Sequence, residues 1–159
     1  MLNLVSMRRK LSLTEKIFFL PLFTLLFGLS GCGSNEPIFP IIPSIEYLSM
    51  EPGTVREGET FKISFSFKVG DGDLGNNSDT KFLFITDTLT GIQLPYSVPD
   101  LSTDARKPSI QGTITVSILG IYMTDPNLNS QRRTFRIKLK DRAGNESNEI
   151  LTPPLIVRP

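Results

Sequence analysis

Histidine and tryptophan are absent from this 159-residue chain, and cysteine occurs once. Without histidine the chain lacks the most common general base and the most common metal ligand, and a Ser-His-Asp catalytic arrangement is excluded. A single cysteine cannot form a disulfide within the chain, so stability must come from a packed core. No Gly-rich phosphate loop opens a helix either. The sequence therefore predicts a protein without catalytic activity.

The chain also lacks an excess of charge of either sign. It carries 17 basic and 16 acidic residues, of which four basic and one acidic residue lie in residues 1–31. The other 128 residues therefore carry 13 basic and 15 acidic residues, a net charge of −2. This balance offers no electrostatic footprint for nucleic acid, so we expect no nucleic-acid partner. The length corresponds to one domain.

The one cysteine lies directly behind a hydrophobic segment near the N-terminus. Four basic residues precede an uncharged apolar stretch from Ile17 to Leu29, which runs into Leu29-Ser30-Gly31-Cys32. This order resembles the signal peptide and lipobox of bacterial lipoproteins. The resemblance implies that residues 1–31 are removed as a signal peptide. It also implies that Cys32 carries a diacylglycerol and usually a third, N-linked acyl chain, which is enough for stable anchoring.

Two alternatives remain for this segment: a transmembrane helix, and an ordinary cleaved signal followed by a chance cysteine. The apolar stretch has 13 residues, whereas a helix needs about 20 to cross a bilayer. Pro21 interrupts it, and Gly28, Gly31 and Gly33 crowd its end, where an anchor helix would have to stay strong. The composition favours the lipoprotein signal.

The residues after Cys32 are Gly33-Ser34-Asn35-Glu36. No aspartate follows the cysteine, so the best-known retention signal for the inner membrane is absent. The resemblance therefore implies a lipid anchor in the outer membrane of a Gram-negative cell. The acidic cluster that resembles a surface-export signal in some lipoproteins is also absent, because Glu36 is the only acidic residue of this run. We therefore expect the periplasmic face rather than the cell surface.

Residues 32–43 are predicted to form the lipidated cysteine and a Pro-rich tether. Pro37, Pro40 and Pro43 recur every three residues, which is the period of a polyproline II helix. The apolar residues between them allow another interpretation, in which Ile38–Ile42 lie on the domain as a first edge strand.

Residues 44–159 show a period of two with almost no helical periodicity. Apolar residues alternate with polar ones in Glu59–Val69, with Phe61, Ile63, Phe65, Phe67 and Val69 on one face. Lys81–Thr86 is apolar on both faces, which predicts a central strand. The pattern predicts about seven short strands in an antiparallel β-sandwich. The other five are Ile45–Tyr47, Ile92–Tyr96, Ile110–Ile118, Phe135–Leu139 and Ile150–Val157, the last an edge strand because of Pro153 and Pro154.

Two short motifs carry a resemblance to a fold family. The run Asp141-Arg142-Ala143-Gly144-Asn145 follows a predicted strand and resembles the F–G turn of bacterial Ig-like domains. Residues 69–76 are similar to a loop of small Ig-like lipoproteins of Gram-negative bacteria. The resemblance implies an all-β, Ig-like antiparallel β-sandwich over residues 44–159. The absence of tryptophan and of an internal disulfide departs from the antibody branch of that fold.

The same two motifs supply the candidate metal ligands. Asp71 and Asp73 follow the second predicted strand, and Asp141 and Asn145 follow the sixth. In an Ig-like sandwich these loops meet at one end, so the four side chains could supply oxygen ligands for calcium. The alternative is that they only stabilise tight turns, where Asp, Asn and Gly are common. Calcium is the one cofactor that the sequence suggests.

Two further patterns concern the surface. Asp87-Thr88-Leu89 resembles an O-glycosylation sequon of exported bacterial proteins, which would place the glycan on Thr88. A basic stripe follows one predicted strand and could meet an acidic glycan or a lipid headgroup, although such stripes are usually only solvated. Its members are Arg132, Arg133, Arg136, Lys138 and Lys140.

The combined prediction is a non-catalytic, lipid-anchored envelope protein that acts as a structural or protein-interaction module. The alternative is a glycan-binding or ligand-binding accessory lipoprotein of an outer-membrane uptake system. Glycan sites usually use exposed aromatic platforms, but tryptophan is absent and the tyrosines Tyr47, Tyr96 and Tyr122 are scattered. This poverty of aromatic residues favours the interaction module.

Overall fold

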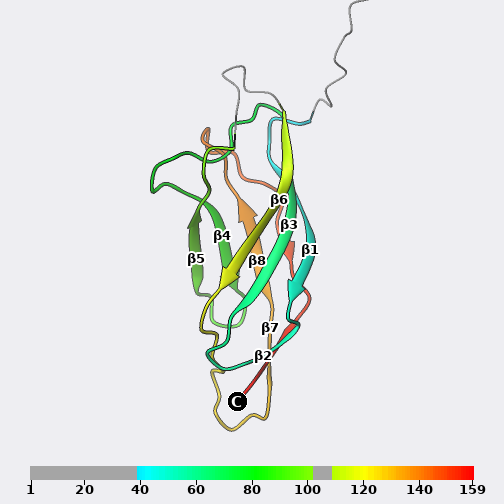
Figure 1. Ribbon diagram of the computed structural model, residues 1–159, viewed down its shortest axis with the longest axis vertical. Helices are drawn as coiled ribbons and strands as arrows, with labels where there is room; N and C mark the ends of the chain where they lie inside the picture. The colour runs from blue at the N-terminus through cyan, green and yellow to red at the C-terminus, as the bar shows by residue number, and fades with distance from the viewer. Residues whose placement is uncertain (1–38, 102–108) are drawn as a thin grey trace, which may run out of the picture. The chain divides into compact units, whose positions relative to one another are not determined.

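The structure, a computed structural model, describes residues 39–101 and 109–159, and this part of the chain folds into β-strands (Figure 1). Its strands are β1 (Ser44–Glu51), β2 (Thr54–Arg56), β3 (Phe61–Val69), β4 (Lys81–Asp87), β5 (Gln93–Ser97), β6 (Ile110–Ile118), β7 (Gln131–Arg133), β8 (Phe135–Leu139), β9 (Ile150–Leu151) and β10 (Leu155–Arg158). No helix in these two ranges is long and apolar enough to cross a membrane.

The strands form three sheets. The front sheet has the order β1-β3-β6, and the back sheet has the order β5-β4-β8-β9. In Figure 1 the front sheet lies in front of the back sheet, and its strands cross those of the back sheet at an angle. An end sheet, β2-β10-β7, continues the back sheet, because β7 leads into β8 and β9 is followed by β10. The all-β prediction is confirmed, and the two facing sheets are compatible with a β-sandwich.

The core lies between the front and back sheets, and the alternation in β3 determines which side chains fill it. The five inward residues from Phe61 to Val69 are all buried, with at most 5% of any side chain exposed. The residues between them are partly or fully exposed. The rings of Phe61 and Phe135 lie 5.3 Å apart and tilted, which links β3 to β8 across the core.

The prediction that residues 81–86 form a central strand is confirmed. β4 pairs with β5 on one side and with β8 on the other. Phe82, Leu83 and Ile85 are buried. The pairing of β4 with β5 shifts register between Lys81 and Leu83, where the successive side chains of Phe82 and Leu83 are both buried. Phe84 on the other face is half-buried.

The C-terminal strand prediction needs a correction. Residues 150–157 form two strands, β9 and β10, separated at Pro153 and Pro154. Proline has no N–H to donate to a ladder, so the first strand ends there and the chain continues in a second sheet.

Two short strands, β2 and β7, were not predicted, because three residues are too few to show an alternation. β2 pairs in parallel with β10, so the sheets are not wholly antiparallel.

The end of the predicted tether lies on the domain. The carbonyl oxygen of Pro40 accepts a hydrogen bond from the Gly70 N–H at 2.8 Å. The Lys68 ammonium lies 5.9 Å from the centre of the Phe39 ring. Residues 39–43 form no strand, and β1 begins at Ser44. The described end of the segment is therefore docked by a local contact and does not form a first edge strand.

Candidate functional site

The two acidic loops predicted to meet do lie side by side. The Arg142 N–H donates to the carbonyl oxygen of Asp73 at 3.0 Å, which joins the loop after β3 to the turn after β8. Asp73 and Asp141 are both buried. The expectation from the sequence about which loops share one end of the domain is therefore confirmed.

The side chains of this cluster already have partners within the protein. The Arg142 Nε donates to Asp73 Oδ1 at 2.6 Å, and this hydrogen bond raises the pKa of Arg142. Both carboxylate oxygens of Asp141 accept hydrogen bonds from Asn145, one from its backbone N–H and one from its side-chain amide. Asp71 accepts from the Asp73 N–H. Within residues 39–101 and 109–159, no three His, Cys, Asp or Glu side chains are grouped as metal ligands. These contacts are those of stabilised turns, with a guanidinium beside Asp73.

The calcium site stays a prediction, and Arg142 makes its test sharper. Calcium would have to displace the guanidinium from Asp73, so a calcium site requires a rise in melting temperature that is larger in Arg142→Met than in the unaltered chain. The rise should disappear in Asp73→Asn and persist in Asp79→Asn, which changes an exposed carboxylate of the same loop. The measurement is thermal unfolding in millimolar calcium and in chelator. Identical melting temperatures would contradict the site.

Two other predicted sites have different outcomes. Cys32 lies outside the described residues, so lipid attachment stays a prediction. Thr88 is exposed in the turn after β4, and its hydroxyl donates to the carbonyl oxygen of Thr134 at 3.0 Å. Asp87, the first residue of the tripeptide, is buried. The exposed position of Thr88 is compatible with O-glycosylation, which would remove this hydrogen bond, but Asp87 lies inside the domain.

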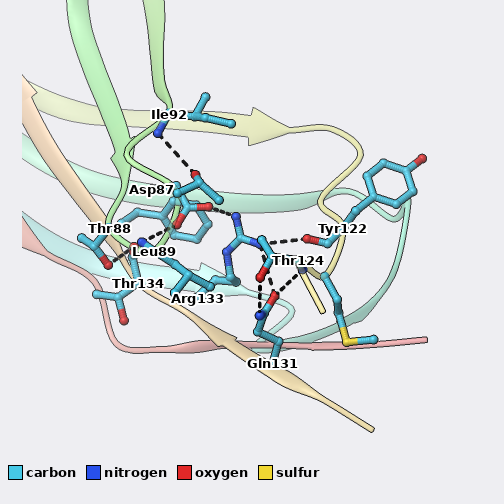
Figure 2. Close-up of polar contacts among 12 residues, drawn as sticks. Asp87, Thr88, Leu89, Ile92, Tyr122, Thr124, Gln131, Arg133 and Thr134 are labelled. Atoms are coloured by element: carbon cyan, nitrogen blue, oxygen red, sulfur yellow. Dashed lines mark hydrogen bonds and ion pairs between the residues drawn. The ribbon is translucent and has the colours of Figure 1, made fainter. Parts of the chain in front are cut away.

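The basic stripe predicted around β7 and β8 is wrong in one member. Arg133 is only 5% exposed and forms an ion pair with Asp87, which is 7% exposed (Figure 2). Its Nη1 donates to the carbonyl oxygen of Tyr122 at 2.8 Å. Burial lowers the pKa of Arg133, and its Nε has no hydrogen-bond partner among the described residues. Arg133 is therefore part of the interior, where it joins three segments of the chain.

The period of the strand explains this error. Arg133 has the same odd-numbered parity along the chain as Phe135 and Ile137, which point into the core. The other members named with it, Arg136 and Lys138, have the opposite parity and face outward. Since side chains alternate along a strand, Arg133 must share the inward face. The sequence contained this signal.

A groove of about 1040 Å³ runs between β5 and β6. One wall is formed by every residue of β6 from Ile110 to Ser117, and the other by the segment from Tyr96 to Pro99. Leu83 and Phe67 contribute to its floor. Among residues 39–101 and 109–159, none of those that line the groove is charged. Its volume is more than twice that of the cavity of about 380 Å³ lined by Ile118–Thr124.

The wall made by β6 is a free strand edge. β6 ends the front sheet and pairs only with β3 among the described strands. It has nine residues, no charge, no proline and an unbroken register with β3. Natural proteins usually protect such an edge with charge, proline, a bulge or short length, because its unpaired N–H and C=O groups can bind another strand.

The other edges of the two sheets have those protections. β1 contains a bulge between Tyr47 and Ser49 and exposes Glu46 and Glu51. β5 contains Pro95, and β9 has two residues. β6 is therefore the one edge of the front and back sheets without any of the four protections.

The inner row of β6 shows where the core is open. Val116 and Ile118 are buried, whereas Ile110 and Ile114 are only half-buried and line the groove. Between them, a Cβ added at Gly112 would lie 3.0 Å from the Phe67 ring, so glycine leaves room for that ring. Burial raises the pKa of Tyr96 on the opposite wall. The groove is thus an opening onto the apolar core.

Sequence reasoning did not identify this groove. A signal was present, because residues 109–118 form a ten-residue run without charge or proline. That run was interpreted only as a strand with one face in water. Whether its edge is free depends on which strand lies beside it, and alternation along one strand carries no information about neighbours.

The comparisons with known proteins do not assign a family. No protein-family model matches the chain, and no curated protein matches it. Among solved structures, the chain is similar to one described as the X-ray structure of Northeast Structural Genomics Consortium target SoR45. The identity is 13%, the TM-score is 0.28, and the alignment covers 74% of this chain and 83% of the other. A likeness at this TM-score carries no argument, so any function must be inferred from the groove itself.

Proposed function

We propose that this chain is a non-catalytic, lipid-anchored protein of the outer membrane, and that its β-sandwich is an Ig-like module that binds a partner protein through the β6 groove. The observation that carries the proposal is the uncharged free edge of β6 beside an opening onto the core. A strand edge without protection is a liability in a monomer and a ready binding surface in a complex.

The strand order supports the Ig-like assignment. Ig-like sandwiches place strands A, B, E and D in one sheet and C′, C, F and G in the other. The front sheet β1-β3-β6 matches A-B-E, and the back sheet β5-β4-β8-β9 matches C′-C-F-G. No described strand occupies the position of D, which is next to β6.

The position of the module in the cell follows from the N-terminal motif. The run Leu29-Ser30-Gly31-Cys32 supports lipid attachment at Cys32, and residues 33–36 favour the periplasmic face of the outer membrane. A lipid anchor keeps the module at the membrane surface, where the effective concentration of a membrane-bound partner is high. Weak binding through a groove can then suffice.

Site-specific photo-crosslinking in intact cells tests the proposal. A photoreactive amino acid at Ser97, which lines the groove, should form a covalent adduct with a partner protein. The matched control is the same amino acid at Gln93, which lies on the same strand and face but outside the groove. We expect an adduct from Ser97, none from Gln93, and a loss of the Ser97 adduct in Cys32→Ala. Equal yields from both positions, or none from Ser97, would contradict the proposal.

The groove also gives the glycan alternative one specific support. Tyr96 and several hydroxyl-bearing side chains, among them Ser97 and Thr113, line the same opening. Aromatic rings and hydroxyl groups are the usual components of a sugar site. A Ser97 adduct that resists protease and is removed by enzymes that degrade polysaccharides would favour this function.

A further inference from the structure

We propose that the groove binds one extended, uncharged segment of the partner, which adds to β6 as a fourth strand of the front sheet. This inference rests on the proposed function, because it states how the partner is recognised.

The first support is the unequal width of the two sheets. The front sheet has three strands and the back sheet has four. Figure 1 shows β6 crossing in front of β4. β5 lies to the left of β6 in this view, and no labelled strand lies in front of β5. The groove lies between the edge of β6 and β5. A strand added to β6 would therefore cover β5 and close the front of the core.

The second support is the backbone of β6. Each residue of a strand carries one N–H and one C=O, and successive residues direct them to opposite edges. β3 uses one edge of β6 over all nine residues. The other edge offers about half of its backbone groups to an added strand, in an unbroken register. Main-chain hydrogen bonds of this kind supply affinity in strand addition.

The lining determines which side chains the partner can place in the groove. Alternate residues of an added strand would point toward Leu83, Ile110 and Ile114, which are buried or half-buried apolar side chains. A charged side chain there would lose water without gaining a partner, because no described residue of the lining is charged. The groove thus selects a segment that has apolar residues at every second position and no charge facing inward.

A second copy of this chain does not fit the same groove. In an antiparallel pair related by a two-fold axis, both sheets keep their core faces on the same side. In each copy β4 lies behind β6, and β5 lies behind the position beside the edge of β6. If the β6 of a second copy occupied that position, the β4 of the second copy would have to lie where the β5 of the first copy already is. The two back sheets would overlap. The occupant is therefore a single strand or extended segment of a different protein.

Hydrogen–deuterium exchange of the full chain in detergent tests this inference. The probe is a peptide as long as β6, with alternating valine and threonine and two lysines beyond its end for solubility. We expect the peptide to slow exchange in Ile110–Ser117 by about fivefold or more, and to leave Ser44–Glu51 of β1 unchanged. A peptide with proline at its centre should give no protection, because it cannot complete the ladder.

Two variants provide matched controls. Ile114→Lys places a charge on the inward face of β6 and should abolish protection by the peptide. Ser66→Lys places the same charge on the outer face of the neighbouring strand β3, opposite Thr113 and outside the groove, and should retain it. Unchanged exchange in β4 shows that each variant is folded. Equal protection in both variants, or no protection in the unaltered chain, would overturn the inference. Protection, without any peptide, of the β6 amides that do not donate to β3 would also overturn it, because the chain would then cover that edge itself.

The outcomes separate the two proposals. A Ser97 adduct in cells without protection by the peptide would leave the interaction module standing and reject strand addition. Protection by the peptide without a Ser97 adduct would reject the proposed cellular function, but the inference that an extended segment can add to β6 would still stand.

Discussion

Replacing Arg133 by methionine is expected to lower the free energy of unfolding by about 3 to 5 kcal/mol, the usual cost of breaking a buried ion pair by removing one partner. The loss leaves Asp87 buried without its cation. It also removes the hydrogen bond from Arg133 to the carbonyl oxygen of Tyr122, which ties the loop after β6 to β7. For a domain with a total stability of about 5 to 15 kcal/mol, this change is large.

The neighbouring arginine provides the control. Arg132 lies on the same strand but is exposed, so Arg132→Met should change stability by no more than about 0.5 kcal/mol. Urea unfolding followed by circular dichroism measures both variants. Equal losses in Arg132→Met and Arg133→Met would contradict the burial of Arg133.

A double variant separates the ion pair from the packing around it. In Asp87→Asn combined with Arg133→Met no charge is left buried, so the loss should be clearly smaller than the sum of the two single losses. Asp87→Asn should keep much of the turn after β4, because Asp87 Oδ1 accepts a hydrogen bond from the Leu89 N–H at 2.9 Å and an amide oxygen can accept it too. Additive losses would show that the two side chains do not interact.

Gly75→Ala is expected to be the second strongly destabilising change, by about 3 kcal/mol. Gly75 has a φ of +76°, a conformation that residues with a Cβ rarely adopt. A Cβ at this position would overlap the carbonyl oxygen of Pro99 and lie 2.8 Å from that of Val98. Both atoms belong to backbone, which moves less easily than a side chain.

Gly91→Ala isolates the cost of the backbone conformation. Gly91 has a φ of +72°, but an added Cβ would meet no atom within 4 Å. It should therefore cost only about 1 kcal/mol. The difference between the two variants measures the close approach of the loop after β3 to the segment after β5. Equal losses in urea unfolding would contradict that contact.

Gly75→Ala should also affect the groove. Val98 and Pro99 form part of its wall, and the Asn76 N–H donates to the Val98 carbonyl oxygen at 3.0 Å. An alanine that pushes this segment away from the loop changes the width of the opening beside β6.

The sequence predicted features that depend on a few neighbouring residues. Alternation in residues 61–69 identified the inward face of β3, and apolar residues on both faces of 81–86 identified a central strand. The two acidic loops were predicted to meet, and they do. The same reasoning missed Arg133, although its parity with Phe135 was visible. It also missed β2 and β7, which are too short to show a period.

What the sequence determined by itself is therefore the all-β class, the face of each longer strand and, as a prediction, the lipid anchor at Cys32. These follow from local patterns, because side-chain direction alternates along any strand and a targeting signal is read as a linear motif. Only the tertiary structure decided that Arg142 lies against Asp73, that Arg133 pairs with Asp87, and that β6 has one edge without a partner among the described strands. Each of these depends on segments that are far apart in the chain, whose contacts are decided by how the sheets pack.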